Sequence, residues 1–592
     1  MIQLTIDKEK ISVEPGTTIL EAARQNGIDI PSLCFLEGVH KYASCRICAV
    51  EVEGARTLQA ACITDAKEGM VIKTNTPRVV KARKIAYELM LSDHTKDCTS
   101  CKRDKSCELQ RLGETLGVTE NRYHTGSVRE QIDISPAISR DLSKCILCRR
   151  CVTSCKNIQK IGILDAQRRG FNTVIAPAMD TSINHAKCTF CGQCVLICPT
   201  GALRETDHIE RVLEALKNPE IKVVMQVAPA VRVALGELFG YPTGTSVTGK
   251  LPAAMRALGA DYTFDTNWSA DLTIMEEGTE FLNRAMSVLS GQKAVLPMIT
   301  SCSPGWVKYL ESYFPQLIPH LSTCKSPHMM LGAITKTYFA EKNNISPKKI
   351  YMVSIMPCTA KKFEIAREEM TDGGLANVDA VLTTREFGQM LKHAGIDFQN
   401  LKDEKFDEPM GQSTGAGDIF GVTGGVMEAA IRTVYATVTG RVLPFARLHI
   451  NSLSGLYRIK QAKIKFENVL QEYKMFEGFE ARVAVTHGLA GAKVLMEQIK
   501  KGDSPYHFIE VMGCPGGCIC GGGQPRSDDP YVRTKRMKAL YKEDESKALR
   551  QSHLNPFIMA LYKDYLGEPG GHLAHELLHT HYVDRMDEKV IQ

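Results

Sequence analysis

The stretch Val511–Pro525 reads VMGCPGGCICGGGQP. These fifteen residues include three cysteines, six glycines and two prolines, in a chain whose composition is otherwise ordinary. Glycine lets the backbone come close to a neighbouring group, and thiolates are soft metal ligands. The stretch therefore predicts a loop that surrounds an inorganic group too large for an ordinary pocket.

The overall composition is that of a globular protein. With 592 residues, 44% hydrophobic and 24% charged, the chain is expected to form several domains. The net charge of +6 comes without a lysine or arginine run, so no nucleic-acid surface is predicted. The first residues lack the order of a signal peptide, and no apolar run reaches the roughly 18 residues of a membrane span. A cytoplasmic protein is expected.

The cysteines are numerous and grouped. Cytoplasmic thiols stay reduced, so the 21 cysteines are not expected to form disulfides. Nineteen of them fall into tight groups, whereas Cys324 stands apart and Cys520 is surplus to its group. Grouping of this kind indicates metal centres.

The first sixty residues contain strand-like runs, a helix and four cysteines. LTIDKEKISVEPGTTILEAARQNGI predicts two short strands and a helix capped by Thr18 or Thr17, with Glu21 in its first turn. The cysteines are spaced C-x10-C-x2-C-x13-C: Cys34, Cys45, Cys48 and Cys62. Plant-type ferredoxins hold a [2Fe–2S] cluster this way, so a β-grasp ferredoxin domain is expected at residues 1–78. The alternative, a zinc ribbon, prefers two CxxC pairs.

A second group follows a helical stretch, VVKARKIAYELMLSDH. Its spacing is H-x3-C-x2-C-x5-C: His94, Cys98, Cys101 and Cys107. Taken alone, this group could bind zinc through three thiolates and an imidazole. After a ferredoxin domain, a His-ligated [4Fe–4S] cluster is the favoured interpretation, in a small domain at residues 79–138. A neutral imidazole in place of a thiolate would raise the cluster's potential.

The most specific pattern lies in a third expected domain, at residues 139–209. KCILCRRCVTSCKN and KCTFCGQCVLICPTGA each contain the C-x2-C-x2-C-x3-C run of two-cluster bacterial ferredoxins. In that pattern the fourth cysteine of each run binds the other cluster. One [4Fe–4S] cluster is therefore assigned to Cys145, Cys148, Cys151 and Cys198. The second is assigned to Cys188, Cys191, Cys194 and Cys155.

From Ile221 onward the pattern becomes α/β. The apolar runs IKVVMQVAP, KAVLPMIT, IYMVSIMP and ARVAVTH are interpreted as buried strands separated by helical stretches. Such a pattern is typical of parallel sheets covered by helices. Several of these strands end at cysteine-bearing loops, where α/β folds collect ligand groups. We therefore expect a catalytic domain at residues 221–592.

Three of these loops resemble the signature loops of the iron-only, or [FeFe], hydrogenases, which have the forms TSCCPxW, MPCxxKxxE and a cysteine-glycine run ending in GGGQP. The chain has, in the same order, TSCSPGW (Thr300–Trp306), MPCTAKKFE (Met356–Glu364) and EVMGCPGGCICGGGQP (Glu510–Pro525). The order of the four accessory clusters also matches the large modular members. The resemblance implies a catalytic subunit for reversible H2 oxidation and proton reduction, with one [2Fe–2S] and three accessory [4Fe–4S] clusters.

The resemblance also implies an H-cluster, a [4Fe–4S] cubane joined through a cysteine sulfur to a diiron unit that carries CO, cyanide and azadithiolate. By position Cys518 would be the bridging cysteine, and Cys358 and Cys514 would hold the cubane. The family's first loop has two adjacent cysteines, a proton relay and then a cubane ligand, but here Cys302 is followed by Ser303. The sequence leaves three possibilities for this corner of the cubane. Ser303 ligates through its oxygen, Cys302 becomes the ligand, or the corner is open or filled by another group.

Further roles carry over to polar residues and methionines. The family's proton relay, leading outward, corresponds to four residues here: Cys302, Glu277, Ser322 and Glu280. Without the resemblance, both glutamates would be interpreted as solvated charges on the helix IMEEGTEF. Lys361 would contact a cyanide ligand, with Glu364 paired to it at helical spacing. Met356 and Met512 would pack around the diiron unit.

Three further motifs receive no function. HELLH (His575–His579) matches the HExxH of zinc proteases but lies in the last eighteen residues, so a surface helix is expected. GTSVTGKL (Gly244–Leu251) has Leu251 where a phosphate-binding loop needs Ser or Thr. STGAGDIFGVTGG (Ser413–Gly425) lacks the strand–GxGxxG–helix order. No flavin or nicotinamide site is therefore expected.

Electrons are expected to leave through another protein. The resemblance to NAD(P)-linked and electron-bifurcating members implies a flavoprotein subunit that reacts with NAD(P), a small [2Fe–2S] subunit and, for bifurcation, ferredoxin. Two other interpretations compete with a catalytic hydrogenase subunit. One is a pure electron-transfer subunit like the large iron–sulfur subunit of respiratory complex I, and the other is a non-catalytic hydrogen sensor or cluster-assembly factor.

Overall fold

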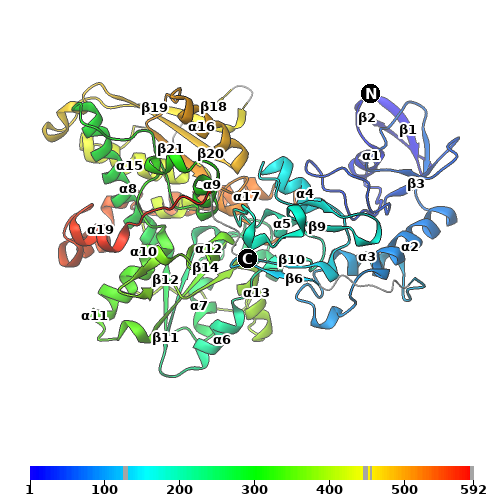
Figure 1. The fold of residues 1–592 in the computed structure, drawn as a ribbon, viewed down its shortest axis with the longest axis horizontal. Helices are drawn as coiled ribbons and strands as arrows, with labels where there is room; N and C mark the ends of the chain where they lie inside the picture. Colours follow the sequence, from blue (N-terminus) through cyan, green and yellow to red (C-terminus); the bar gives the residue numbers. More distant parts are fainter. Residues whose placement is uncertain (124–130, 445–450, 454–455, 587–592) are drawn as a thin grey trace. The chain divides into compact units, whose positions relative to one another are not determined.

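The computed structural model describes residues 1–123, 131–444, 451–453 and 456–586. The chain divides into two compact units. The first comprises Met1–Ala186 and Gln193–Arg204, and the second Lys187–Gly192 and Glu205–Gln592. In Figure 1 the first unit runs from blue to cyan and the second from cyan-green to red.

The N-terminal part of the first unit is a five-stranded sheet with a helix packed on it. The strand order is β2-β1-β5-β3-β4, with β1 parallel to β5 and the other described pairs antiparallel. The strands are β1 (Ile2–Ile6), β2 (Glu9–Val13), β3 (Ala49–Val52), β4 (Gln59–Ala60) and β5 (Val71–Lys73). Ile19 and Leu20 of α1 (Ile19–Gln25) share a core with this sheet. Thr18 caps α1 in a capping box with Glu21, which confirms the predicted helix start.

The rest of the first unit consists of short elements. The hydroxyl of Tyr87 on α2 donates to the backbone oxygen of Leu109 on α3, 3.0 Å away, and ties these helices together. A three-stranded sheet has the order β10-β7-β6, and β8 pairs with β9. The helices are α2 (Pro77–Ser92), α3 (Glu108–Leu116), α4 (Arg150–Thr153) and α5 (Gln193–Ile197). The strands are β6 (Ile132–Ile134), β7 (Ile138–Asp141), β8 (Asp165–Gln167), β9 (Val174–Ala176) and β10 (Leu203–Glu205).

The second unit contains a parallel sheet of order β12-β11-β14-β17. Its strands are β11 (Lys222–Val227), β12 (Tyr262–Asp265), β14 (Ile350–Met356) and β17 (Ala380–Thr383). Their side chains are buried almost throughout, as expected for a parallel sheet covered on both faces. Two of the predicted strands are thereby confirmed. Helices packed around this sheet are α6 (Ile209–Lys217), α7 (Lys250–Ala257), α10 (Pro327–Ile334), α11 (Ala340–Lys342) and α13 (Thr384–His393).

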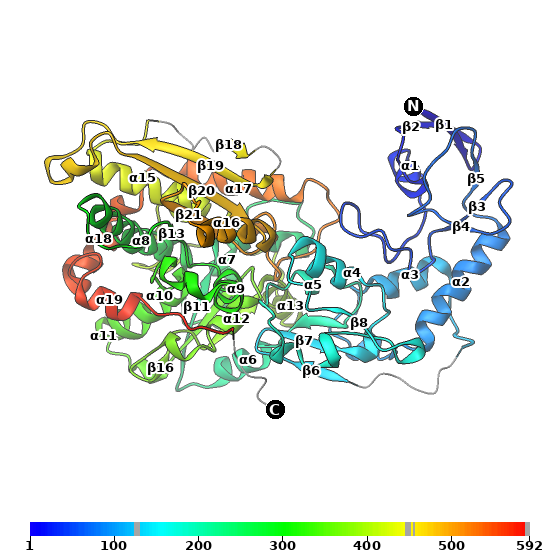
Figure 2. The same cartoon turned by 45° about the horizontal axis from the view of Figure 1, so that its top comes forward.

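A second sheet of this unit has the order β13-β21-β20-β19-β18. The strands are β13 (Met298–Ile299), β18 (Asn451–Leu453), β19 (Leu456–Lys465), β20 (Glu480–His487) and β21 (Phe508–Met512). β13, β21 and β20 are parallel, but β19 and β18 are antiparallel, so the expectation of parallel sheets alone is wrong here. The run KAVLPMIT forms a strand only at Met298–Ile299, because Pro297 has no N–H for a ladder. Figure 2 shows this sheet with its helices α15 (Gly425–Thr439) and α16 (Leu489–Lys501).

Three strand ends bring the signature loops together. β13, β14 and β21 end at Ile299, Met356 and Met512, directly before the three cysteine-bearing loops. The remaining helices of the unit are α8 (Thr266–Leu289), α9 (Pro304–Tyr313), α12 (Ala360–Glu364), α14 (Gly415–Asp418), α17 (Val532–Ser546), α18 (Pro556–Leu561) and α19 (His572–Leu578). A small hairpin joins β15 (Thr371–Asp372) and β16 (Leu375–Ala376). Among the described residues, no helix is both long enough and apolar enough to cross a membrane.

Candidate active site and cluster-binding sites

A cavity of about 80 Å³ lies within the second unit where the three signature loops meet. Each loop contributes polar or thiol side chains to its wall: Cys302 and Ser303, Cys358 and Lys361, and Cys514 and Cys518. The cavity has room for several atoms the size of a water molecule, which is more than a single metal ion needs. Met356 and Met512 also line it, and Met512 Sδ lies 3.9 Å from Cys518 Sγ.

The thiols of this cavity are buried. Burial raises the pKa of Cys358, raises that of Cys518 to about 12, and raises that of Cys514 well above the usual value. Such thiols lose their protons readily only when a cation takes the proton's place. Several convergent, buried thiols in one cavity therefore fit a soft metal centre better than acid–base chemistry of their own.

The glycines of the third loop are required by neighbouring backbone. A Cβ on Gly521 would lie 2.1 Å from the backbone oxygen of Pro357, in the second loop. Gly517 has φ +89°, and a Cβ there would lie 2.8 Å from the backbone nitrogen of Thr423. Both glycines also line the cavity, so the loop can pack against protein on one side and a bound group on the other.

Ser303 lies on the cavity wall, and its hydroxyl is engaged. Ser303 Oγ accepts a hydrogen bond of 3.1 Å from the N–H of Gly513, in the third loop. It is the residue before α9 but makes no capping hydrogen bond to that helix. The hydroxyl thus links two signature loops at the position where the family's second cysteine would stand.

Of the predicted relay residues, Cys302 lines the cavity and Glu277 lies next to it in the predicted order. Glu277, on α8, is fully buried, and neither of its carboxylate oxygens has good hydrogen-bond geometry to a described residue. Burial, reinforced by the negative charge of Glu280, raises the pKa of Glu277 to about 8. Burial and then Glu277 raise the pKa of Cys302 well above its usual value. Glu277 is therefore not a solvated surface charge.

Glu280, one turn further along α8, is in direct contact with Ser322. The Ser322 hydroxyl donates to Glu280 Oε2 at 2.8 Å. Arg284 donates to the other oxygen, Oε1, at 2.6 Å, and the backbone N–H of Thr323 donates at 3.1 Å to Oε2. Sequence reasoning did not include Arg284, although its spacing of four residues from Glu280 on a helix was a visible signal.

Lys361 is held at the cavity by a hydrogen-bond network. Its Nζ donates to Glu364 Oε2 at 2.7 Å, to Ser326 Oγ at 2.7 Å and to the backbone oxygen of Cys302 at 3.2 Å. His328 Nε2 lies 2.7 Å from the same Glu364 oxygen. Burial alone would raise the pKa of Glu364, but Lys361 and His328 outweigh it and lower the pKa to about 2. No motif marked His328, because only the tertiary fold brings it to this carboxylate.

The four N-terminal cysteines lie together in the first unit. All of them are buried: Cys34, Cys45, Cys48 and Cys62. Cys34 is within hydrogen-bonding distance of the Cys45 and Cys62 thiols, and Cys48 of the Cys62 thiol. This proton sharing lowers the pKa of Cys34. A compact, buried set of four thiols is suited to hold a small cluster.

His94 has an unused ring nitrogen. Its Nδ1 is buried and has no hydrogen-bond partner among the described residues. Burial, together with the positive charge of Lys144, lowers the pKa of His94 to about 4, so the imidazole is neutral. Cys107 and Cys101 are half-buried and Cys98 is exposed. An orphaned neutral imidazole nitrogen is the form in which histidine binds metal.

A second cavity of the first unit is lined by four cysteines: Cys145, Cys148, Cys151 and Cys198. Burial and then Cys198 raise the pKa of Cys148 to about 12. The fourth cysteine of the second run thus lies with the first three of the first run. Of the other set, Cys155 and Cys194 belong to the first unit, and Cys188 and Cys191 to the second. Within the second unit, the backbone oxygen of Cys191 lies 3.9 Å from Cys514 Sγ.

Comparison with known families agrees with this domain order. The C-terminal domain of the iron-only hydrogenase large subunit matches residues 221–522, and the iron hydrogenase small subunit matches 530–585. A 2Fe-2S iron-sulfur cluster binding domain matches residues 1–77. The iron-sulfur binding region of NADH-ubiquinone oxidoreductase-G matches 83–122, and a 4Fe-4S dicluster domain matches 144–202.

The chain is therefore an iron–sulfur oxidoreductase, and it belongs to the iron-only hydrogenase family. It is a catalytic [FeFe]-hydrogenase subunit that acts on H2, with iron–sulfur domains for electron relay. This finding excludes a pure electron-transfer subunit.

Among its relatives is the NADP-reducing hydrogenase subunit HndD of Solidesulfovibrio fructosivorans, 49% identical over 99% of both chains. Iron hydrogenase 1 of Clostridium pasteurianum is 39% identical over 98% of this chain and 100% of that one. A solved structure of [FeFe]-hydrogenase HydA1 from Chlamydomonas reinhardtii covers 64% of this chain and 99% of its own. It has 44% identity and a TM-score of 0.59.

Proposed function

We propose that the cavity where the three signature loops meet holds an H-cluster, with Cys358 and Cys514 as cubane ligands and Cys518 as the bridging cysteine. The observation that carries this proposal is the convergence of these thiols from two loops on one cavity beside a buried glutamate and a lysine. When bound, such a group supplies redox-active iron at which H2 is split or formed. Met356 and Met512 would pack against it.

The proton path is supplied by the chain itself. Cys302 would exchange a proton with Glu277, whose pKa of about 8 lets it accept and release protons near neutral pH. Ser322 would pass the proton on to Glu280, to which its hydroxyl already donates. Arg284 fixes the Glu280 carboxylate in place from the other side. Each member lies within one turn of α8 or in a loop beside it.

Lys361 has an electrostatic role in this proposal. Glu364 and Ser326 orient its ammonium group at the cavity wall, where it can stabilise a negatively charged ligand such as cyanide. His328 in turn fixes Glu364. Ser303, which takes the place of the family's second cysteine, keeps the three possibilities given above, because the hydrogen bond from Gly513 uses only one of the two lone pairs of its hydroxyl oxygen.

The electron path would run through four accessory clusters. The first unit would contain a β-grasp [2Fe–2S] domain at residues 1–78 and a His94–cysteine [4Fe–4S] domain at 79–138. A two-cluster domain at residues 139–209 would hold two further [4Fe–4S] clusters, and the catalytic domain would span 221–592. The grouped thiols, the orphaned His94 Nδ1 and the cavity lined by Cys145 and its neighbours support these assignments.

The electrons would pass to NAD(P) through other subunits. A relative of almost the same length is named an NADP-reducing hydrogenase subunit. We propose as partners a flavoprotein subunit that reacts with NAD(P) and a small [2Fe–2S] subunit, with ferredoxin as a further partner if the complex bifurcates electrons. The cytoplasm is the proposed location, because a reducing compartment keeps so many cluster cysteines free of disulfides.

Maturation of the purified chain with the diiron cofactor tests the assignment of its clusters. The matured chain should contain about 20 iron atoms and reduce a dye with H2, while the chain without the diiron unit should not reduce it. Iron near 12 atoms with bound zinc would contradict the electron path.

Adding the flavoprotein tests the partners. The isolated chain should not reduce NAD or NADP, and the flavoprotein should restore this reaction. Deleting residues 1–78 should weaken the restoration but spare dye reduction. Reduction of NAD(P) by the pure chain would contradict this proposal.

A further inference from the structure

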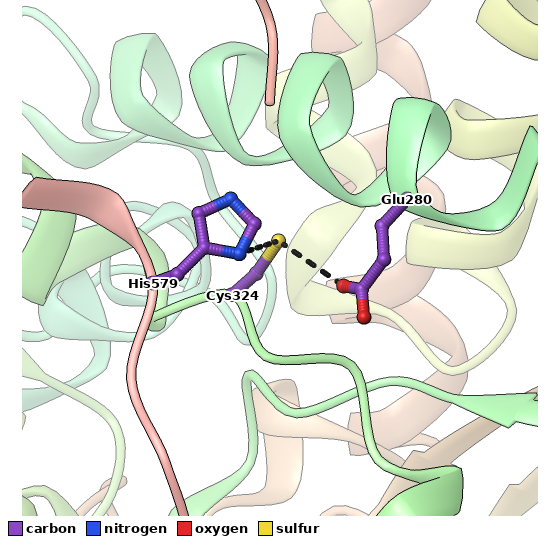
Figure 3. Close-up of side chains that lie close together, drawn as sticks. All are labelled: Glu280, Cys324 and His579. Atoms are coloured by element: carbon purple, nitrogen blue, oxygen red, sulfur yellow. Dashed lines mark hydrogen bonds between the residues drawn. The ribbon is translucent and has the colours of Figure 1, made fainter. Parts of the chain in front are cut away.

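Three side chains lie close together at the outer end of the proposed proton path: Glu280, Cys324 and His579. Only Glu280 belongs to that path. Glu280 comes from α8, Cys324 from the loop before α10, and His579 directly follows α19. The backbones of Cys324 and His579 form an isolated antiparallel bridge, which holds these two segments together. Cys324 Sγ lies 3.8 Å from Glu280 Oε2 and 4.0 Å from His579 Nδ1. Figure 3 shows the sulfur between the carboxylate and the imidazole.

The orientation of the His579 ring is fixed by a hydrogen bond to Glu276. Its Nε2 lies 3.0 Å from Glu276 Oε2. Glu276 is fully buried and also accepts hydrogen bonds from the Tyr562 hydroxyl and the Gly570 N–H. A carboxylate with these partners acts as an acceptor, so Nε2 carries the proton and Nδ1 is an acceptor, with the Thr323 hydroxyl 2.8 Å and Cys324 Sγ 4.0 Å away. A histidine that binds metal through one nitrogen usually donates the other to a carboxylate in this way.

The surroundings of Cys324 favour a cation. The residue is 1% exposed, and its sulfur lies 3.8 Å from Glu280 Oε2. Arg284 pairs with Oε1 of Glu280, so Oε2 is the oxygen that faces the sulfur. A divalent cation bound here would be balanced by the Glu280 carboxylate and by the thiolate that Cys324 would supply.

We propose that Glu280, Cys324 and His579 form a binding site for a divalent metal ion of the Zn²⁺ type. A carboxylate, a thiolate and an imidazole are the ligand types that zinc prefers, and a water molecule would complete a tetrahedron. The ligand atoms all lie within 4.8 Å of one another. Around a tetrahedral ion with bonds of about 2.0–2.3 Å they would be roughly 3.5 Å apart, so the two contacts of the sulfur would shorten by about half an ångström or less and the carboxylate–imidazole pair by up to about 1.3 Å.

The binding step balances in charge. The metal ion replaces the proton of the Cys324 thiol, which is released to water, and a Zn–S bond forms. Glu280 binds as a carboxylate and His579 through Nδ1, which gives up its contact of 2.8 Å with the Thr323 hydroxyl. The net result is the uptake of one divalent cation and the release of one proton.

This site uses only the last residue of the HELLH motif. His575 is exposed and stacks on His579 with ring centroids 4.7 Å apart, and Glu576 is exposed as well. His579 Nε2 is already engaged by Glu276. The protease-like arrangement of two histidines on one ion is therefore not formed, and the expectation that this motif lies wholly on a surface helix is wrong for His579, which is buried.

Metal binding should slow turnover, and this consequence rests on the proposed function. Glu280 Oε2 now accepts the Ser322 hydrogen bond that would deliver protons. A metal ion on the same oxygen would take the lone pair that the proton needs. Zinc is therefore expected to act as an inhibitor at the outer end of the relay.

X-ray absorption at the zinc edge tests the site directly, because the signal is distinct from that of iron. The matured full-length chain is incubated with Zn²⁺, freed of excess metal, and analysed for zinc and iron. We expect about one zinc per chain with a single sulfur ligand at about 2.3 Å, at unchanged iron content. Cys324→Ala and His579→Gln should lose this zinc, and the control His575→Gln should retain it. Cys324→Ser provides a second variant if Cys324→Ala does not fold.

Two results would overturn the site: no zinc bound by the wild-type chain, or the same sulfur-ligated zinc in Cys324→Ala. Inhibition is then measured as the rate of dye reduction with zinc divided by the rate without zinc. This ratio should fall several-fold in the wild type and stay near one in Cys324→Ala. Zinc bound at this site without inhibition would support the site and contradict the relay through Glu280. If the wild-type chain binds no zinc but a substitution of Glu280 lowers turnover, the metal site is contradicted and the relay is supported.

Discussion

The two cysteine-lined cavities differ in what surrounds their thiols. Around Cys145, Cys148, Cys151 and Cys198 the wall is otherwise formed mainly by aliphatic side chains and arginines. Around Cys358, Cys514 and Cys518 it includes Lys361 and His328, and Glu277 lies behind Cys302. A site that only passes electrons needs ligands and insulation. A site that also moves protons needs titratable groups within reach, and of these two cavities only the one with Cys358, Cys514 and Cys518 has a chain of them among the described residues.

Removal of the Cys302 thiol should separate the two kinds of site most clearly. Cys302→Ala should lower turnover by about 10²–10⁴-fold, because the first proton carrier is lost. The infrared bands of CO and cyanide should remain, since the proposed cluster ligands are other cysteines. Iron content and these bands are the controls. Loss of the cubane in this variant would show instead that Cys302 has become a ligand in place of Ser303.

The pH dependence of H2 evolution should reflect Glu277. Burial and Glu280 raise its pKa to about 8, so it is protonated below this pH and can donate a proton to Cys302. Evolution should therefore fall as the pH rises through about 8, by up to tenfold per unit, whereas an ordinary glutamate would already have lost its proton near pH 4.5. Glu277→Gln should lower turnover and abolish this break, and Glu341→Gln, at an exposed glutamate of α11, should keep it. A break near pH 4.5 would contradict the assignment.

The raised pKa also has a consequence for stability. At pH values between the pKa of Glu277 in the unfolded chain and its higher pKa in the folded protein, the native state holds a proton that the unfolded state has released. The contribution of Glu277 to stability is therefore lost progressively as the pH rises from about 4.5 to about 8. Thermal unfolding of Glu277→Gln should accordingly depend less on pH over this range than that of the wild type.

A substitution at His94 tests the other side of the comparison, where only electrons should be affected. His94→Cys should keep the cluster but lower its potential, by on the order of 100 mV, because a thiolate adds negative charge. Redox titration monitored by electron paramagnetic resonance measures this shift. His185→Cys, at an exposed histidine of the same unit, should leave the titration unchanged. An unchanged titration in His94→Cys would mean that His94 is not a ligand.

The smallest effect is expected at Ser303. Ser303→Cys should restore the usual cysteine pair and change the spectrum and potential of the cubane, because sulfur is a softer ligand than oxygen. The variant also loses the hydroxyl that accepts from Gly513, so thermal unfolding should be recorded alongside. Identical spectra in variant and wild type would show that position 303 does not contact the cubane.

The sequence could predict those features of the fold that depend on residues close together in the chain. Thr18 capping α1, the strands β11, β14 and β20 and the spacing of the cysteine groups follow from residues close together in the chain. The mixed pairing of the second sheet could not be predicted, because a buried strand has the same apolar sequence pattern whether it pairs parallel or antiparallel. The two-residue β13 shows how one proline overrides an apolar run.

The surroundings of the site depend on contacts between distant residues. His328 reaches Glu364 across 36 positions, and His579 reaches Glu276 across 303. Read alone, the segment IMEEGTEF has the charges of an exposed helix, and only the fold shows that Glu276 and Glu277 are both buried. The relay residues were predicted from the resemblance to a family, and no local pattern would have predicted them.

The partners of Glu276 also bear on how the protein is made. Its hydrogen bonds come from Tyr562, Gly570 and His579, which leave the ribosome about three hundred residues after it. Synthesis proceeds from the N-terminus, so the earlier domains can fold while these partners are still missing. Until they arrive, the middle of α8 carries a carboxylate that cannot be buried without cost. The catalytic unit should therefore close only after translation has passed His579, and insertion of its cofactor should follow synthesis rather than accompany it.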